Sequence, residues 1–235
     1  MSHKITIGKM FKPDYFVQSE IDRLRVNIGF VGANKKVIMI TSTTANEGKS
    51  YVSVLLWNEL AKAGKRVCFV DADMRKSALR ASLRLHTDQE EFTGLSHYLA
   101  GSSELQDIIY ATEENNAAFI PTITMINPNL LLEGDRMDYL LQTLRKDFDY
   151  IIVDTPPMGL VSDGQSIAAK CDGCLLVVRA HETARKAAQS TVRKLNQANC
   201  PLLGVVLNRV SDKKSKRYIG GKYGYYKSGY YAYYH

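Results

Sequence analysis

The sequence predicts an α/β fold built on a doubly wound, mostly parallel sheet. Short apolar runs of strand length alternate with longer stretches in which apolar residues recur every three or four positions. The short runs are apolar at nearly every position, which is typical of parallel strands that are buried on both faces. Helices are then needed to cover both faces of the sheet.

The predicted elements alternate along the chain. Strands are expected over residues 37–41, 67–70, 150–153, 175–178 and 203–207, and helices over residues 15–30, 50–63, 131–146 and 184–197. The first helix carries many charges, so we expect it to pack outside the sheet or on a neighbouring molecule. The segment after Val210 has no periodicity and contains four glycines, which indicates a flexible tail. The chain is therefore divided into an N-terminal segment with an outer helix (1–30), a central domain (31–210) and a basic, tyrosine-rich tail (211–235).

The composition is that of a soluble globular protein. The 235 residues are 45% hydrophobic and 23% charged, which suits one domain with appendages. No run approaches the roughly 18 apolar residues of a membrane span, and the first residues lack the apolar centre of a signal peptide. A cytoplasmic location is therefore expected. Four cysteines (Cys68, Cys171, Cys174 and Cys200) are too few for a disulfide scaffold, and the single C-x-x-C lacks a second pair for zinc, so we expect buried thiols.

The net charge of +7 is concentrated in the tail. Residues 211–235 contain six basic residues and one acid, which leaves +2 for the first 210 residues. The sequence therefore predicts no broad nucleic-acid-binding face. Contact of the tail with an anionic membrane surface or with single-stranded nucleic acid remains a lesser alternative.

A phosphate-binding loop is predicted where the first strand passes into a helix. Gly48, Lys49 and Ser50 form the end of a Walker A motif, although the first glycine of the usual pattern is replaced by Thr43. In such a loop the backbone amides surround the phosphates, the lysine reaches the β- and γ-phosphates, and the hydroxyl binds Mg²⁺. The nucleotide-binding residues are expected to be Ala45, Asn46, Glu47, Gly48, Lys49, Ser50 and Tyr51.

Acidic residues follow two other predicted strands. Asp71 and Asp73 come directly after residues 67–70, which we place beside the strand of the phosphate loop, and Asp154 ends a strand of Walker B form. The carboxyl ends of parallel strands meet at the ligand-binding edge of a doubly wound sheet. A single aspartate there is more often a turn or helix cap. Three acids beside a glycine-lysine-serine loop instead favour a Mg²⁺–nucleotide site.

These motifs, with the tyrosine cluster at the end of the chain, resemble the bacterial tyrosine kinases of capsule and exopolysaccharide assembly. The resemblance extends from Leu24 to the tail, and its most specific part inside the fold is the D-x-D-x-R motif from Asp71 to Arg75. It implies a P-loop fold of the deviant Walker type, shared with MinD-like and ParA-like ATPases. It also implies an ATP-dependent enzyme that phosphorylates its own tyrosines and regulates polysaccharide synthesis and export.

The resemblance assigns roles to the site residues. Lys49, Asp71, Asp73 and Asp154 would be catalytic, and Asp71 would be the base that accepts the proton of the tyrosine hydroxyl, whose pKa is near 10. Mg²⁺ would be bound through Ser50, Asp73 and Asp154. Asn208 matches an asparagine that contacts adenine, although a turn that ends the last strand explains it nearly as well.

The tail is the expected substrate. Eight of the fourteen tyrosines lie from Tyr218 onward, among glycine, lysine and serine. Composition alone also allows a low-complexity tail without this role. The resemblance implies that the tail of one subunit enters the site of the next. The expected phosphate acceptors are Tyr223, Tyr225, Tyr226, Tyr230, Tyr231, Tyr233 and Tyr234.

The resemblance also implies partners. The unphosphorylated protein would form a ring, such as an octamer, through an E-x-x-R-x-x-R motif in the first helix. Glu20 and Arg23 fit the first half of that motif, position 26 is valine, and Arg25 fits an alternative register. Phosphate charges on crowded tails would loosen the ring by repulsion. A separate transmembrane activator would recruit the protein to the inner face of the membrane, and a cognate tyrosine phosphatase would reverse the modification.

Three other functions are compatible with parts of this sequence. A chromosome-partitioning or cell-division-site ATPase would carry a lysine where this chain has Thr44, and it would not need the tyrosine tail. A protein in which nucleotide only stabilises an assembly would retain the same ligands, so the sequence leaves it open. Nucleic-acid binding through the basic tail would show a steep dependence on salt.

Overall fold

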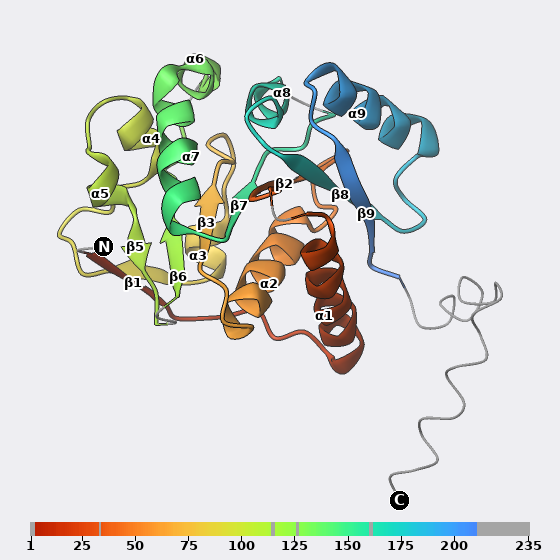
Figure 1. The fold of residues 1–235 in the computed structure, drawn as a ribbon, viewed down its shortest axis with the longest axis horizontal. Helices are drawn as coiled ribbons and strands as arrows, with labels where there is room; N and C mark the ends of the chain where they lie inside the picture. Colours follow the sequence, from red (N-terminus) through yellow and green to blue (C-terminus); the bar gives the residue numbers. More distant parts are fainter. Residues whose placement is uncertain (1–2, 33, 114–115, 126, 160–161, 211–235) are drawn as a thin grey trace, which may run out of the picture.

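The computed structural model describes residues 3–32, 34–113, 116–125, 127–159 and 162–210. Its centre is a nine-stranded sheet with helices on both faces, in the strand order β4-β1-β5-β6-β3-β7-β2-β8-β9 (Figure 1). The strands are β1 His3–Ile7, β2 Val37–Ser42, β3 Val67–Asp71, β4 Leu85–Thr87, β5 Tyr110–Ala111, β6 Ala117–Ile120, β7 Tyr150–Asp154, β8 Gly173–Arg179 and β9 Leu202–Asn208. The helices are α1 Tyr15–Phe30, α2 Lys49–Lys62, α3 Leu79–Ser82, α4 Leu95–Leu99, α5 Leu105–Ile108, α6 Asn129–Glu133, α7 Asp135–Asp147, α8 Asp163–Ala168 and α9 Arg185–Gln197.

The six strands from β6 to β9 in this order are all parallel. The doubly wound, mostly parallel sheet is thereby confirmed. The placement of β3 beside β2 was wrong, because β7 lies between them and pairs with both. This arrangement puts the strand that ends at Asp154 between the phosphate loop and Asp71, so all three strand ends are adjacent.

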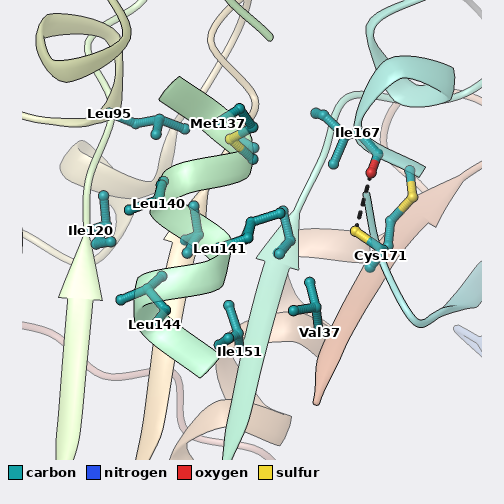
Figure 2. Packing of buried hydrophobic residues seen from close by; sticks show 14 of the residues in the cluster. Val37, Leu95, Ile120, Met137, Leu140, Leu141, Leu144, Ile151, Ile167 and Cys171 are labelled. Atoms are coloured by element: carbon teal, nitrogen blue, oxygen red, sulfur yellow. Dashed lines mark hydrogen bonds between the residues drawn. The ribbon is translucent and has the colours of Figure 1, made fainter. Parts of the chain in front are cut away.

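The parallel strands alternate their side chains between two cores. Val37 and Met39 of β2 face one cluster with α7, α8 and α9, whereas Ile38 and Ile40 face the other with α1, α2 and α3. Figure 2 shows the first cluster, in which Leu140, Leu141 and Leu144 of α7 pack on Ile120 and Ile151 of the sheet. Because successive side chains of a strand point to opposite faces, an apolar strand supplies both cores at once.

The edge of the sheet next to β6 was not predicted. β1 pairs antiparallel with β4 and parallel with β5, and β5 pairs antiparallel with β6. These strands are short, and most residues of β1 and β4 are polar. Their conformation depends on pairing with neighbours far away in the sequence, which propensity alone does not indicate.

The predicted helices are present, with one correction. The helix expected over residues 131–146 is divided at Gly134, which is extended and separates α6 from α7. Asp135 and Asp138 then lie in the first turn of α7 and Arg145 and Lys146 in its last, which suits the helix dipole. Helix α1 begins at the cap residue Asp14 and packs outside the sheet against α2, as expected. None of the helices in the described ranges is long and apolar enough to cross a membrane.

Candidate active site

The phosphate loop connects β2 to α2 and requires a glycine at residue 48. Gly48 has a φ of 93°, in the left-handed region, and a Cβ there would lie 2.0 Å from the Asn208 side-chain nitrogen. Gly48 is also the N-cap of α2 and has no side chain that could accept a hydrogen bond from the first-turn amides. Those amides and the positive end of the helix dipole therefore suit an anion.

Glu47 supports the loop from inside the protein. Its buried carboxylate accepts hydrogen bonds from the amides of Thr43 and Thr44, at 2.6 and 3.0 Å, and from the hydroxyl of Thr183. Only the backbone of Glu47 is therefore available to a nucleotide. Ala45 and Asn46 are exposed at the tip of the loop.

Lys49 joins the three strand ends. Its Nζ lies 2.9 Å from Asp73 Oδ2, 3.7 Å from Asp154 Oδ2 and 3.1 Å from the Ser50 hydroxyl. Ser50 donates to Asp154 at 2.6 Å, and Ser53, one turn further along α2, donates to the other Asp154 oxygen at 3.0 Å. The predicted catalytic lysine and two of the three predicted acids thus form one hydrogen-bonded cluster.

Asp71 lies beside this cluster and contacts its own loop. Only 2% of Asp71 is exposed, and its carboxylate accepts hydrogen bonds from the Asp73 amide at 3.3 Å and from the Ser77 hydroxyl. Burial, followed by the charge of Asp154, raises the pKa of Asp71 well above its ordinary value of 3.8. A carboxylate with a raised pKa is a stronger base towards a tyrosine hydroxyl.

The site contains more negative charge than its lysine neutralises. Burial raises the pKa of Asp154, and Lys49 with the two serine hydroxyls only partly offsets this. Burial alone would lower the pKa of Lys49, but Asp154 and Asp73 outweigh it and raise that pKa. One lysine among three buried carboxylates is a suitable environment for a further cation.

The donor set fits magnesium shared with a nucleotide. The described residues contain no cluster of three acidic, histidine or cysteine ligands that could hold a metal by itself. Mg²⁺ in phosphoryl-transfer sites usually takes one or two carboxylates, with phosphate and water oxygens as its other ligands. The hydroxyl of Ser50 and the carboxylates of Asp154 and Asp73 are oxygen donors of that kind.

Several known proteins are similar to this chain. Residues 35–200 match the protein family described as "AAA domain". The chain is 35% identical to a tyrosine-protein kinase CpsD of Streptococcus agalactiae, in an alignment that covers 86% of this chain and 87% of that protein. The chain belongs to the bacterial tyrosine-protein kinase family. The predicted family, enzyme class and nucleotide-binding fold are thereby confirmed.

Two solved structures, described next, share the fold of this kinase. The kinase domain of the Escherichia coli tyrosine kinase ETK is 31% identical, with a TM-score of 0.72, and the match covers 83% of this chain and 77% of that one. The septum site-determining protein MinD of Pyrococcus horikoshii, solved with Mg-ADP, is 24% identical with a TM-score of 0.64, and the match covers 75% and 71% of the two chains. The second likeness shows a shared fold alone.

The remaining predicted residues of the kinase lie in three places. Asn208, at the end of β9, donates to the Glu47 carbonyl at 2.8 Å and so lies against the phosphate loop. The ring of Tyr51 contacts Phe11, with ring centroids 5.1 Å apart. Glu20 and Arg23 form an ion pair of 3.3 Å on α1, and Arg25 is half-buried on the same helix. All seven predicted acceptor tyrosines lie in 211–235, outside the described residues.

Three polar contacts of the kinase site were missed. Ser53 follows Ser50 by three positions, so helical spacing could have placed it on the same face of α2. Ser77 contacts Asp71 through the loop after β3, and Arg75 contacts Asp163 at the start of α8, 88 positions away. No spacing in the sequence indicates these last two contacts.

Proposed function

We propose that this kinase transfers the γ-phosphoryl group of Mg·ATP to the C-terminal tyrosines of a neighbouring copy. The observation that carries this proposal is the cluster of Lys49 with Ser50, Asp73 and Asp154 at the ends of three adjacent strands. Phosphoryl transfer depends mainly on positioning and on neutralising charge, and this cluster offers both.

Each residue has a role in the proposed reaction. Lys49 and the loop amides bind and orient the phosphates, and Ser50, Asp73 and Asp154 would hold Mg²⁺, which neutralises phosphate charge. The tyrosine oxygen forms a bond to the γ-phosphorus, the bond from that phosphorus to the bridging oxygen of ADP breaks, and Asp71 accepts the hydroxyl proton. The buried position of Asp71 keeps this proton transfer away from bulk water.

A groove beside the phosphate loop suits the adenine base. It has a volume of about 830 Å³ and lies between α1, the start of α2 and the end of β9, with Asn27, Gly48, Tyr51 and Asn208 in its walls. Aromatic and apolar walls with a few polar groups are typical of nucleotide sites. The amide of Asn208 supplies the polar group that a base edge requires.

The last described residues before the tail lie beside this site. β9 ends at Asn208, which touches the phosphate loop, and Arg209 and Val210, the last described residues, line the nucleotide groove. The thirteen positions from Val210 to Tyr223 span at most about 45 Å when extended. This reach allows delivery to a neighbouring site, and the relationship to the capsule kinases favours that route over delivery to the same subunit.

The proposal extends to assembly and regulation. Tyr15 and Phe30, at the two ends of α1, are each 83% exposed, and Val26 between them is exposed as well, which leaves apolar surface beside Glu20 and Arg23 for subunit contacts. We infer a ring of unphosphorylated subunits, a separate transmembrane activator, a cognate phosphatase and a role in capsular or exopolysaccharide synthesis and export. These inferences rest on the relationship to the tyrosine kinases.

Replacing the seven acceptor tyrosines with phenylalanine is expected to remove the phosphate additions from the intact mass of the protein. The wild-type kinase, fused to the cytoplasmic segment of its activator and supplied with Mg·ATP, should show a ladder of additions. ATP binding by calorimetry should not change, because the acceptors are not part of the nucleotide site. A ladder that persists in the phenylalanine variant would place the acceptors elsewhere. ATP binding without any ladder in the wild-type protein would favour a nucleotide-dependent assembly switch, the function that the shared MinD fold also suits.

A further inference from the structure

Arg75 makes a two-pronged ion pair across the candidate active site. Its Nε and Nη2 donate to the two oxygens of Asp163, at 2.5 and 2.9 Å, and Nη2 also donates to Asn129 at 3.0 Å. Asn129 in turn donates to the Ser162 hydroxyl at 3.0 Å. Asp163 is 1% exposed, so loss of Arg75 would leave a buried carboxylate without its ion-pair partner.

The segment that contains Asp163 is also tied to the phosphate loop. It follows β7, and near its start the amides of Met158 and Gly159 donate to the carbonyls of Ser42 and Thr43, at 2.9 and 3.1 Å. A Cβ on Gly159 would lie 2.1 Å from the Thr43 carbonyl, so this close approach requires glycine. The end of β2 and the segment after β7 therefore fit closely together.

The loop that contains Arg75 is tied to the phosphate loop from the other side. Arg75 follows Asp73 by two positions, and Asp73 binds Lys49 at 2.9 Å. The Ala72 amide donates to the Asp154 carbonyl at 2.8 Å. The loops after β2, β3 and β7 are therefore each in contact with the other two, and the pair of Arg75 with Asp163 connects the loop after β3 to the segment after β7.

We propose that Arg75 is a positioning residue, which acts through Asp163 to hold the Asp71–Asp73 loop against the phosphate loop. Two of its donor nitrogens are already used by Asp163 and Asn129, so it orders the site and leaves the phosphates to Lys49. This inference rests on the proposed function, because the loop that Arg75 holds bears the proposed base. Lysine cannot reproduce the two-pronged contact, since its ammonium is a point donor.

The test is a double-mutant cycle on tail phosphorylation by the activator-fused kinase. Arg75→Ala and Asp163→Ala are each expected to lower kcat by roughly 10- to 100-fold, the usual cost of a misplaced catalytic group. The KM for ATP should change by less than about threefold, since neither residue is among those proposed to bind the nucleotide. The double variant should be no slower than the slower single variant, because both changes remove one contact. Arg75→Lys should fall between wild type and Arg75→Ala.

The chain supplies a matched control at the opposite end of β2. Arg145 pairs with both oxygens of Asp172 at 2.6 and 2.8 Å, and its side chain is 31% exposed, as is that of Arg75. Asp172 also accepts from the amides of Lys36 and Val37, where β2 begins, far from the phosphate loop. Arg145→Ala should therefore lower the melting temperature, because it also removes a paired arginine, and leave kcat near the wild-type value.

Three results would overturn the inference while the proposed function stands. The first is a double variant whose loss of kcat equals the sum of the two single losses in free energy. The second is a rise in the KM for ATP with Arg75→Ala but not with Asp163→Ala. The third is a loss of kcat with Arg145→Ala as large as that with Arg75→Ala. Wild-type protein that binds ATP without phosphorylating its tail would instead defeat the proposed function, and the role of Arg75 in that reaction falls with it.

Discussion

Lys49→Ala is expected to reduce phosphorylation of the tail tyrosines by roughly 10²- to 10³-fold or more, the usual loss when a positioned charge donor is removed from a reaction site. Lys49 is the cation at the meeting point of the three strand ends, with its amine 2.9 Å from Asp73 and 3.7 Å from Asp154. Without Lys49 the site loses the positive charge that would bind and orient the phosphates. Intact-mass spectra recorded over time with Mg·ATP measure the effect.

The fold of the Lys49→Ala variant should persist, because alanine is favourable in a helix and the packing of α2 on the sheet is unchanged. Lys62→Ala is the matched control. Lys62 lies at the other end of α2 and also forms an ion pair, with Glu59 at 2.8 Å, but it is far from the acids. It should retain wild-type phosphorylation. Normal phosphorylation by Lys49→Ala, with the mutation verified, would contradict the assignment of the site.

Asp71→Asn should separate activity from stability. We expect phosphorylation to fall by roughly 10²-fold or more, since amide nitrogen and oxygen cannot accept the tyrosine proton. The free energy of unfolding without nucleotide should rise instead, because asparagine carries no charge and removes the cost of burying the Asp71 carboxylate. Stability should rise because three acids are buried close together, which raises the free energy of the folded state. The proposed reaction nevertheless requires these acids.

The pH dependence gives a second measure of the same effect. The pKa of Asp71 is raised in the folded state, so the folded protein holds this proton more tightly than the unfolded chain. Its contribution to stability is complete below the ordinary pKa of 3.8 and is lost as the pH rises through the raised value. The gain from Asp71→Asn should therefore grow with pH, and melting temperatures between acid and neutral pH measure it.

Asp149 offers a control of opposite sign. Burial alone would raise the pKa of Asp149, but hydrogen bonds from Arg66 outweigh it and lower that pKa. Asp149 is a surface partner of Arg66 at the start of β7, with a contact of 3.0 Å. Asp149→Asn should lower stability slightly at neutral pH and leave phosphorylation unchanged.

A loss of stability with Asp71→Asn would contradict the prediction. It would show that hydrogen bonds and ion pairs offset the burial of the acids more fully than their contacts indicate.

The parallel half of the sheet could be predicted because its strands are buried on both faces. Val37–Ser42 and Val67–Asp71 are mostly apolar, and apolar runs of this length are too short for a typical helix, so they are predicted as strands. The edge strands could not be predicted in this way. Tyr110–Ala111 has two residues, and three of the five residues of His3–Ile7 are polar, so each strand depends on a partner that only the folded chain supplies.

The candidate site shows the same division. Lys49, Asp71 and Asp154 could be placed because motifs fix them at strand ends, and parallel topology brings strand ends together. The order of the strands was not predictable from the motifs, which is why β3 was placed beside β2. Contacts such as Arg75 with Asp163 depend on loop conformation and join residues far apart in sequence, so only the structure reveals them.

The most direct test of the account mixes two variants that are each unable to modify themselves. One is Lys49→Ala, which keeps the acceptor tyrosines, and the other has phenylalanine at all seven acceptor positions but keeps the site. Both carry the activator segment, and their different masses allow each to be followed in one spectrum with Mg·ATP. We predict that the Lys49→Ala chain acquires phosphates only when the phenylalanine variant is present. A mixture that stays unmodified, while the wild-type kinase is modified under the same conditions, would contradict transfer between subunits.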